Sequence, residues 1–544
     1  MRAAKRFFFK KRAMAFSVLA VYVIVNVVSS ALTGFDVFKA IIDFPGGFAW
    51  FLANFTPQTN SFDHMGRIAS ALGSTILDSF AASGVAAILA FIFALAGSRT
   101  VGAGGPVPAI VRAIASVFRN IPIVAWAFLL LYSFKQSEFT GFFALFLQSF
   151  GFLTRSFLET IDEIDTGPIE ALRACGASYL QIVTLGVIPL CITRITSWIL
   201  YMIETNIRDA TLVGMLTGTG VGFIFDLYYK SMRYETAGLV IILIALFVIV
   251  LELASNFVRR RLQSSTQTRR ARKNDGKIRL RFLYSCDYLL ACVTVAIAAV
   301  STWTFVQMDY GNVDLLVAWS DFWGLVWSMA TTPGLSGHFE MSDVVMGVFV
   351  TLALAVLTTF VGALIAFVLG LLAASNLSNV FASNAIKAVM SVMRAVPTIL
   401  WVLVFTVAIG LGAEACVIGM LFHSVSYLVK SYSESFEEVS PGVLEALRST
   451  GASWWQIALR CVVPEKLNEM VSWTFIRFEI NFVAAVVVAG MAGSGGIGYE
   501  LFLAGQFYFD IHEIGLIVYL CLAVSIALEF ASTRLRRSSG ERGA

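Results

Sequence analysis

Residues 170–182 read EALRACGASYLQI, and residues 445–457 read EALRSTGASWWQI, 275 positions further along the chain. Both copies are rich in polar and small residues, whereas most of the surrounding chain is strongly apolar. A segment that has an acidic residue in its first turn and a glycine just past its end is typical of a short helix. The chain therefore contains the same polar helix twice, which predicts two equivalent contact points for a partner.

The composition identifies the class of protein to which these helices belong. Of the 544 residues, 58% are hydrophobic and 14% are charged, whereas soluble domains contain about 25% charged residues. Open sheet edges cannot face lipid, so we expect an all-α polytopic membrane protein. A span needs roughly 20 apolar residues. Twelve stretches qualify, near 13–32, 71–97, 112–133, 139–154, 186–212, 236–258, 283–306, 344–373, 388–410, 414–430, 463–489 and 513–533.

The net charge of +4 is informative through its placement, because Lys and Arg concentrate at 2–12, 259–281 and 534–542. Basic residues stay on the cytoplasmic side of a membrane, which predicts that both termini and the middle of the chain are cytoplasmic. Six spans between consecutive clusters satisfy that parity. Each cluster adjoins an apolar span, which favours membrane orientation over nucleic-acid binding.

The repeat extends far beyond the opening motif. Arg119 and Pro122 match Arg394 and Pro397 at the same separation of 275 residues, and this regularity indicates an internal duplication. Because both copies begin and end with basic residues, we expect two parallel six-helix repeats. The expected divisions are a first repeat at 1–258 with its core at 71–258, a basic linker at 259–281, a second repeat at 282–537 with its core at 344–537, and a tail at 538–544.

The loops that contain the polar helices have the same design. Pro168 and Gly442 precede each short helix, and Gly176 and Gly451 follow it at a position suited to a left-handed cap. This pattern, which ends at a proline thirteen residues beyond the glycine in both copies, resembles the EAA loop of ABC importer permeases. The resemblance implies two coupling helices that dock on cytoplasmic ATPases. The residues that carry it are Glu170, Ala171, Gly176, Ala177, Glu445, Ala446, Gly451 and Ala452.

A closer resemblance is to the phosphonate-transport branch of type I importer permeases. It rests on the Arg-x-x-Pro segments, on EIDTGPIEALRACGAS at 163–178 and on RFEINFVAAVVVAGMAGSGGIG at 477–498. A typical member has one six-span unit that pairs with itself, so this chain resembles two fused units. The resemblance implies a bacterial inner-membrane permease for a phosphonate or related phosphorus oxyanion. It also implies one external solute-binding protein and two copies of a cytoplasmic ATPase as partners.

Nothing in the sequence predicts catalysis or a cofactor in this chain. No GxxxxGK[ST] phosphate loop is present, so ATP and Mg are expected to bind the partner ATPase. The GxGxxG match at 493–498 follows an apolar span rather than a strand, which excludes a dinucleotide site. His64, His338 and His512 have no metal-ligand spacing, and we therefore expect no metal site.

Polar residues inside spans are costly and usually face a cavity or a partner helix. In the fifth spans Met202 and Val483 stand where the family pattern has arginine, so each repeat retains one arginine at a different depth. Glu204 and Arg208 lie four residues apart and can pair. These residues are candidates either for a translocation path or for interhelical packing. The set is Arg119, Gln148, Glu204, Asn206, Arg208, Arg394, His423, Arg477, Glu479 and Asn481.

Two other functions remain open from the sequence. An ion-gradient-driven secondary transporter could also have two six-helix repeats, but it does not need two matched docking loops. A membrane scaffold or sensor without transport is the third possibility.

Overall fold

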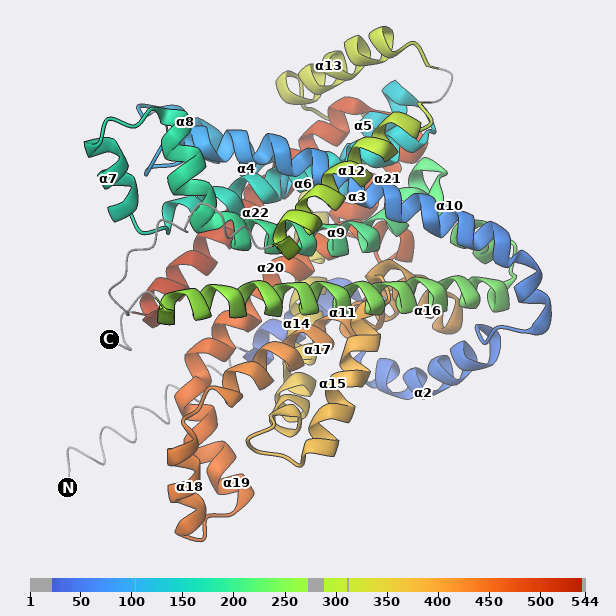
Figure 1. Ribbon diagram of the computed structural model, residues 1–544. Helices are drawn as coiled ribbons and strands as arrows, with labels where there is room; N and C mark the ends of the chain where they lie inside the picture. Colours follow the sequence, from blue (N-terminus) through green and yellow to red (C-terminus); the bar gives the residue numbers. More distant parts are fainter. Residues whose placement is uncertain (1–21, 103, 273–287, 311–312, 541–544) are drawn as a thin grey trace. The chain divides into compact units, whose positions relative to one another are not determined.

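The computed structural model describes residues 22–102, 104–272, 288–310 and 313–540, and these residues form helices, turns and loops (Figure 1). The expectation of an all-α protein is confirmed for this part of the chain. The chain divides into two compact units. Unit 1 comprises residues 1–54 and 329–544, and unit 2 comprises residues 55–328.

Unit 2 contains most helices of the first repeat, followed by two helices from the start of the second repeat. They are η1 (Thr59–His64), α3 (Met65–Gly97), α4 (Val107–Asn120), α5 (Ile123–Phe134), α6 (Glu138–Asp162), α7 (Gly167–Ala174), α8 (Tyr179–Gln181), η2 (Ile182–Val187), α9 (Ile188–Thr217), α10 (Gly220–Lys230), α11 (Tyr234–Arg272), α12 (Tyr288–Gln307) and α13 (Leu315–Thr331).

Unit 1 begins with the helix Tyr22–Thr33 and continues with a matching series. That series is α2 (Val37–Asn54), α14 (Met341–Ala373), α15 (Val380–Ala395), α16 (Thr398–Ile409), α17 (Ala413–Glu437), α18 (Pro441–Ser449), α19 (Trp454–Ile457), η5 (Ala458–Val462), α20 (Val463–Ala492), α21 (Ile497–Leu503), η6 (Ala504–Tyr508) and α22 (Ile511–Gly540). Two equivalent pairs of long helices have equal lengths, with 33 residues in α3 and α14 and 25 in α6 and α17.

The two compact units do not coincide with the two expected sequence repeats, because the first helices of each repeat belong to the other unit. Phe44 of α2 stacks on Phe405 of α16 with ring centroids 5.9 Å apart, so the N-terminal helices pack on the core of the second repeat. Conversely, the Ser301 hydroxyl on α12 donates to the Phe80 carbonyl of α3 at 2.9 Å. Each compact unit therefore contains the core of one repeat and the first helices of the other.

The number of candidate spans is close to the expected twelve. Among the described residues, eight helices are long and apolar enough to cross a membrane, and three bent pairs bring the number to eleven. The stretch expected at 283–306 corresponds to the short apolar helix Cys292–Gln307. Part of the stretch expected at 13–32 lies outside the described residues.

Two expected spans, at 112–133 and 388–410, are not continuous helices, and the prediction is wrong in this respect. The chain turns by 87° between α4 and α5 and by 85° between α15 and α16. A proline disfavours helical geometry in the residue before it. Ile121 and Val396 accordingly adopt ψ values of 125°, just before Pro122 and Pro397. Each expected third span is therefore two short helices that meet at a sharp corner.

The regions expected to carry the basic clusters are only partly described. The linker expected at 259–281 begins as the last turns of α11, and residues 273–281 lie outside the described part of the chain. The cluster at 2–12 lies outside it as well. So do residues 541–544 of the expected tail.

A threonine fixes the close approach of helices at the same place in each unit. The Thr75 hydroxyl accepts a hydrogen bond from the Val221 amide at 2.8 Å, and the Thr351 hydroxyl accepts one from the Ile497 amide at 2.9 Å. Each bond joins the first long helix of the unit to the start of a short helix, α10 or α21. The duplication thus preserves individual contacts as well as the lengths of the two pairs of long helices.

Candidate functional site

The two polar helices of the sequence repeat are α7 in unit 2 and α18 in unit 1, and each expectation of a short helix is confirmed (Figure 1). Glu170 lies in the first turn of α7, where its charge is favoured by the helix dipole. The expectation is wrong for Glu445, because α18 begins at Pro441 and has no acidic residue in its first turn. Glu170, Ala171, Glu445 and Ala446 are all exposed. The two helices therefore present the same small and acidic surface to solvent.

Both helices end in the same backbone motif. The φ angles of Gly176 and Gly451 are +76° and +77°, which confirms the expected left-handed caps. The Gly176 amide donates to the Arg173 carbonyl and the Ala177 amide donates to the Leu172 carbonyl, both at 3.0 Å. These two bonds define a Schellman motif, in which a glycine satisfies the last free carbonyls of a helix.

The second copy repeats these bonds residue for residue. The Gly451 amide donates to Arg448 at 3.0 Å, and the Ala452 amide donates to Leu447 at 3.3 Å. Ala177 and Ala452 are half-buried beside their helices, while both glycines are exposed with open space where a Cβ atom would stand. The glycines are therefore required by backbone conformation and not by crowding.

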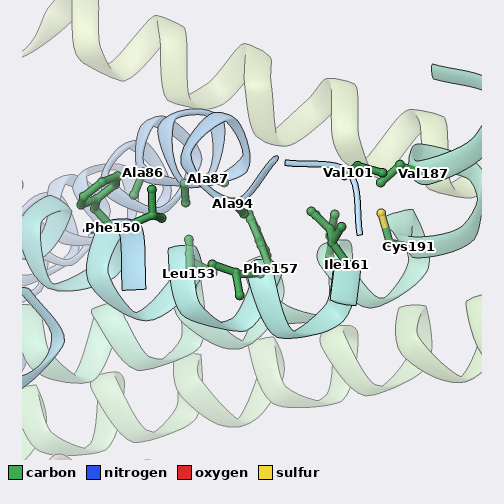
Figure 2. Close-up of a cluster of buried hydrophobic side chains, with 14 of the residues drawn as sticks. Ala86, Ala87, Ala94, Val101, Phe150, Leu153, Phe157, Ile161, Val187 and Cys191 are labelled. Carbon is green, nitrogen blue, oxygen red and sulfur yellow. The ribbon is translucent and has the colours of Figure 1, made fainter. Parts of the chain in front are cut away.

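One apolar residue attaches each polar helix to its unit. Ile169 of α7 is 1% exposed and belongs to a cluster of buried side chains from α3, α6 and α9. Figure 2 shows this cluster, in which Leu153, Phe157 and Ile161 of α6 lie beside Ala94 of α3. Ile169 therefore packs α7 against the same core as the long helices.

Leu444 of α18, 275 residues after Ile169, has the equivalent place in unit 1. It is 2% exposed and packs in a cluster with Leu428 and Phe436 of α17 and Met470 of α20. The sequence alone does not show which residue of each polar helix is buried. The structure identifies Ile169 and Leu444 as the anchors.

The return of the chain to the long helix also follows one pattern. The Ser178 amide donates to the Gln181 side chain at 2.8 Å, and the Ser453 amide donates to the Gln456 side chain at 2.8 Å. A π-helical turn, η2 or η5, follows each of these caps and precedes α9 or α20. Such turns are rare and frequently lie at functional sites.

An arginine of each polar helix reaches a loop of its own unit, and sequence analysis missed its role. Arg173 Nη2 donates to the Thr100 carbonyl at 2.8 Å, between α3 and α4. Arg448 Nη2 donates to the Asn376 carbonyl at 2.6 Å, between α14 and α15. The only available signal was the presence of arginine in both copies of EALR, because the partner carbonyls lie more than 70 residues away.

A carboxylate at the end of α6 or α17 holds the same loop from the other side. Asp162 accepts hydrogen bonds from the Arg99 amide at 2.8 Å and from Arg112 at 2.6 Å. Glu437 accepts from the Ser375 amide at 2.8 Å and from Lys387 at 2.7 Å. Each polar helix is therefore connected through one loop to the ends of three longer helices.

A large apolar side chain stands next to each polar helix and was also missed. Leu180 is 72% exposed and Trp455, its counterpart 275 residues later, is 60% exposed. The exposed apolar side chains at equivalent positions are a further feature that the two units share. Together with the exposed faces of α7 and α18, they form what we call the two docking faces.

Among the residues expected in the translocation path, the two asparagines lie in buried interhelical networks. Asn206 Nδ2 donates to Ser83 at 2.8 Å and to Ser149 at 2.7 Å, which joins α9 to α3 and α6. Asn481 Nδ2 donates to Thr359 at 2.9 Å and its Oδ1 accepts from Ser424 at 2.9 Å. Both asparagines are 0% exposed, and they hold three long helices together.

The charged residues of the expected fifth spans, α9 and α20, also form contacts within their units. Arg208 pairs with Glu204 at 3.0 Å, which confirms the expected pairing along α9, and Arg259 of α11 lies 3.9 Å from the same carboxylate. Arg477 is 2% exposed and its Nε donates to Ser424 at 3.1 Å. Glu479 is half-buried on α20.

The fourth helices carry Gln148 and His423 at equivalent, half-buried positions on α6 and α17. Gln148 Nε2 donates to Asp209 of α9 at 3.1 Å. Asp209 is a membrane-embedded acid that sequence analysis did not single out. Asp78, on α3, is another, and it lines a small pocket with Thr75 and Gly220. Both would have been found by counting every acidic residue within the apolar stretches.

Arg119 and Arg394 occupy the last turns of α4 and α15, directly before the sharp corners at the prolines. Both are half-buried. A cation at the C-terminal end of a helix is favoured by the helix dipole. The structure therefore places these residues at the corners of the bent pairs, remote in sequence from the polar helices.

These features define an all-helical membrane protein with two related helix bundles, each of which carries a rigidly anchored docking face. The family model for the binding-protein-dependent transport system inner membrane component matches residues 85–267 and 366–539. The chain belongs to this family, which comprises the permeases of type I ABC importers. It is therefore a multi-pass protein of the bacterial inner membrane, and its relatives are permease subunits rather than ATPases.

Individual relatives agree with the family assignment. The chain is 26% identical over 478 residues to the phosphate-import permease protein PhnE of Mycolicibacterium smegmatis, which covers 87% of this chain and 86% of that protein. It is 29% identical over 188 residues to the phosphite transport system permease protein PtxC of Stutzerimonas stutzeri, across 34% of this chain and 68% of that protein. An inward-facing structure of the MetNI methionine ABC transporter covers 37% of this chain and 97% of its own, at 23% identity and a TM-score of 0.32.

Family membership favours the ATP-driven permease over the ion-gradient-driven secondary transporter. The two separate matches to the family model correspond to two copies of the permease domain in one chain. ABC ATPases and external binding proteins are the general partners of such permeases.

Proposed function

We propose that this chain is a fused permease that imports a phosphorus oxyanion, such as phosphonate, phosphite or phosphate. It engages two copies of a cytoplasmic ABC ATPase, one at each docking face, and receives its substrate from one external binding protein. ATP and Mg bind the ATPases. The termini and the α7 and α18 ends of the units face the cytoplasm.

The observation that carries this proposal is the duplication of the docking geometry. α7 and α18 share an exposed glutamate, a buried apolar anchor, a Schellman cap and an arginine tether. Selection on packing alone does not require two exposed surfaces to agree in this detail. Two identical partners that bind in the same way do require it.

Support for the substrate class comes from the relatives, whose names specify phosphate import and phosphite transport. The charged residues of α9 and α20 already have partners within the protein, and we therefore expect them to contribute little to substrate selectivity. Arg208 is paired with Glu204, and Arg477 is bonded to Ser424 inside its unit. We therefore assign substrate discrimination chiefly to the external binding protein, and the path residues serve passage.

Reconstitution with its ATPase and binding protein tests the substrate class. In proteoliposomes that contain ATP, the complex is expected to take up phosphonate, phosphite or phosphate when the matching binding protein is present outside. The same ligand should stimulate ATP hydrolysis. Methionine, the substrate named for the MetNI structure, provides the unrelated control ligand.

Two results would contradict the proposal in different ways. Uptake by vesicles that lack any ATPase would contradict ATP-driven transport. Stimulation of ATP hydrolysis by methionine, and by none of the three phosphorus oxyanions, would contradict the substrate class alone.

A further inference from the structure

Three side chains that are far apart in sequence meet at one end of unit 1. His338 Nδ1 lies 3.2 Å from Glu513 Oε2 and 3.8 Å from Asp510 Oδ2. The potential ligand atoms of the three side chains all lie within 4.8 Å of one another. Residue 338 lies in the segment before α14, whereas the two acids lie at the start of α22.

Hydrogen bonds orient both carboxylates toward the histidine. Glu513 Oε1 accepts from the Ser336 amide at 3.1 Å and from the His338 amide at 3.2 Å, which leaves Oε2 directed at the imidazole. Asp510 Oδ1 accepts from the His512 amide at 2.9 Å and from the Glu513 amide at 3.1 Å. Such outer contacts are the ones that hold metal ligands in position.

The imidazole is held in place as well. The His338 ring stacks on Tyr508 of η6 with centroids 4.2 Å apart and an angle of 10° between the planes. This contact fixes the plane of the ring while Nδ1 remains directed at the two carboxylates. All three potential ligands are therefore oriented before anything binds.

Both carboxylates of the cluster are largely buried. The side chain of Glu513 is 0% exposed and that of Asp510 is 12% exposed. Among the described residues, neither carboxylate forms an ion pair with Lys or Arg, and His338 is their shared partner. Two carboxylates in a buried place are stabilised when a cation neutralises them.

The distances suit such an ion. Zinc binds imidazole nitrogen and carboxylate oxygen at about 2.0–2.2 Å in tetrahedral geometry, which places neighbouring ligand atoms about 3.3–3.5 Å apart. The observed separations of 3.2 and 3.8 Å lie on either side of that range. His338 is 39% exposed, so solvent can supply the fourth ligand. One nitrogen and two oxygens favour a first-row transition ion over Mg or Ca.

We propose that His338, Asp510 and Glu513 form a three-ligand site for a divalent transition-metal ion, in the first place Zn²⁺. The bound ion fastens the segment at 332–340 to the start of α22. The same segment is already joined to α22 by the Gly334 amide, which donates to the His512 carbonyl at 3.1 Å. Metal binding would make this contact rigid.

The place of the site in unit 1 defines its relation to the docking face. It adjoins the start of α14, and the loop after the other end of α14 carries the Asn376 carbonyl that Arg448 contacts. A helix of 33 residues is about 50 Å long at 1.5 Å per residue. The site therefore lies at the end of the unit opposite α18, and on the proposed orientation it is external.

The first repeat lacks this arrangement. The residues equivalent to His338, Asp510 and Glu513, at offsets of 276 and 277, are Phe62, Arg233 and Thr236. None of these three provides a ligand for a transition-metal ion. The site is therefore a property of the second repeat alone, and we expect one ion per chain.

Zinc binding to the purified full-length chain tests the proposal. After treatment with a chelator, the chain in lipid nanodiscs is titrated with ZnCl₂ and bound zinc is measured by equilibrium dialysis. The wild type is expected to bind one more Zn²⁺ per chain than His338→Gln or Asp510→Asn. His64→Gln, which removes a histidine of unit 2, is expected to bind as the wild type does.

A second measurement separates loss of the site from loss of the fold. Zn²⁺ should raise the thermal unfolding temperature of the wild type and of His64→Gln, but not that of His338→Gln, while all three unfold at similar temperatures without metal. Co²⁺ in place of Zn²⁺ should give visible absorption bands in the wild type only when His338 is present. Equal zinc binding by the wild type and His338→Gln would overturn the proposal. These measurements do not depend on transport, so their outcome is independent of the proposed function.

Discussion

Replacing Gly176 and Gly451 together with valine is expected to reduce ATP-driven uptake at least tenfold, while the protein still reaches the membrane. Both glycines have φ near +76°, and a side chain with a branched Cβ disfavours that conformation by about 1–2 kcal/mol at each position. Relief of the strain would break the Schellman bonds and change the direction in which α7 and α18 end. Tenfold corresponds to about 1.4 kcal/mol, so two strained caps suffice for this loss.

The matched control uses the same two positions. Asn adopts the left-handed conformation more readily than other residues, so Gly176→Asn with Gly451→Asn is expected to retain most of the uptake. Gly34→Val provides a second control, because Gly34 also has a positive φ of 69° and open space around it but lies far along the chain from both docking faces. Equal uptake by the valine and asparagine double variants would contradict the role assigned to the caps.

Shortening both anchors, Ile169→Ala with Leu444→Ala, is expected to uncouple ATP hydrolysis from transport. Each substitution removes a nearly buried side chain, which costs about 2–5 kcal/mol in a packed core. Helices as short as α7 and α18 are not stable alone and depend on this packing. The docking faces would still bind ATPase, but their movement would no longer reach the long helices. The measured quantity is the number of substrate molecules taken up for each ATP hydrolysed, which should fall at least tenfold.

Val443→Ala is the matched control for the anchors. Val443 precedes Leu444 on α18 but is 43% exposed, so its truncation removes similar atoms without disturbing the core. We expect an unchanged ratio of substrate taken up to ATP hydrolysed. Thermal unfolding measurements should first show that the wild type and the anchor double variant are both folded. A normal ratio of substrate taken up to ATP hydrolysed in the double variant would then show that α7 and α18 do not act through the buried cores.

The features that sequence analysis predicted correctly depend on local patterns. The helices α7 and α18, their left-handed glycines and the pairing of Glu204 with Arg208 all follow from residues no more than about eight positions apart. The repeat strengthened the predictions of the two helices and their glycines, because those signals occurred twice.

The features that sequence analysis missed depend on distant parts of the chain. Arg173 contacts a carbonyl 73 residues away, and His338 meets carboxylates more than 170 residues away. The packing of the first helices of each repeat on the core of the other repeat likewise depends on contacts between distant residues. The corners at Pro122 and Pro397 were the exception, because the residue before a proline is locally restricted and could have suggested a break.

The central claim is that one chain binds two ATPase molecules through α7 and α18. Native mass spectrometry of the purified complex tests it most directly. The wild type is expected to appear with two ATPase copies. A variant in which Glu445, Ala446 and Trp455 are replaced with arginine is expected to appear with one. A wild-type complex with a single ATPase, or two ATPases retained when both docking faces are altered in this way, would contradict the account.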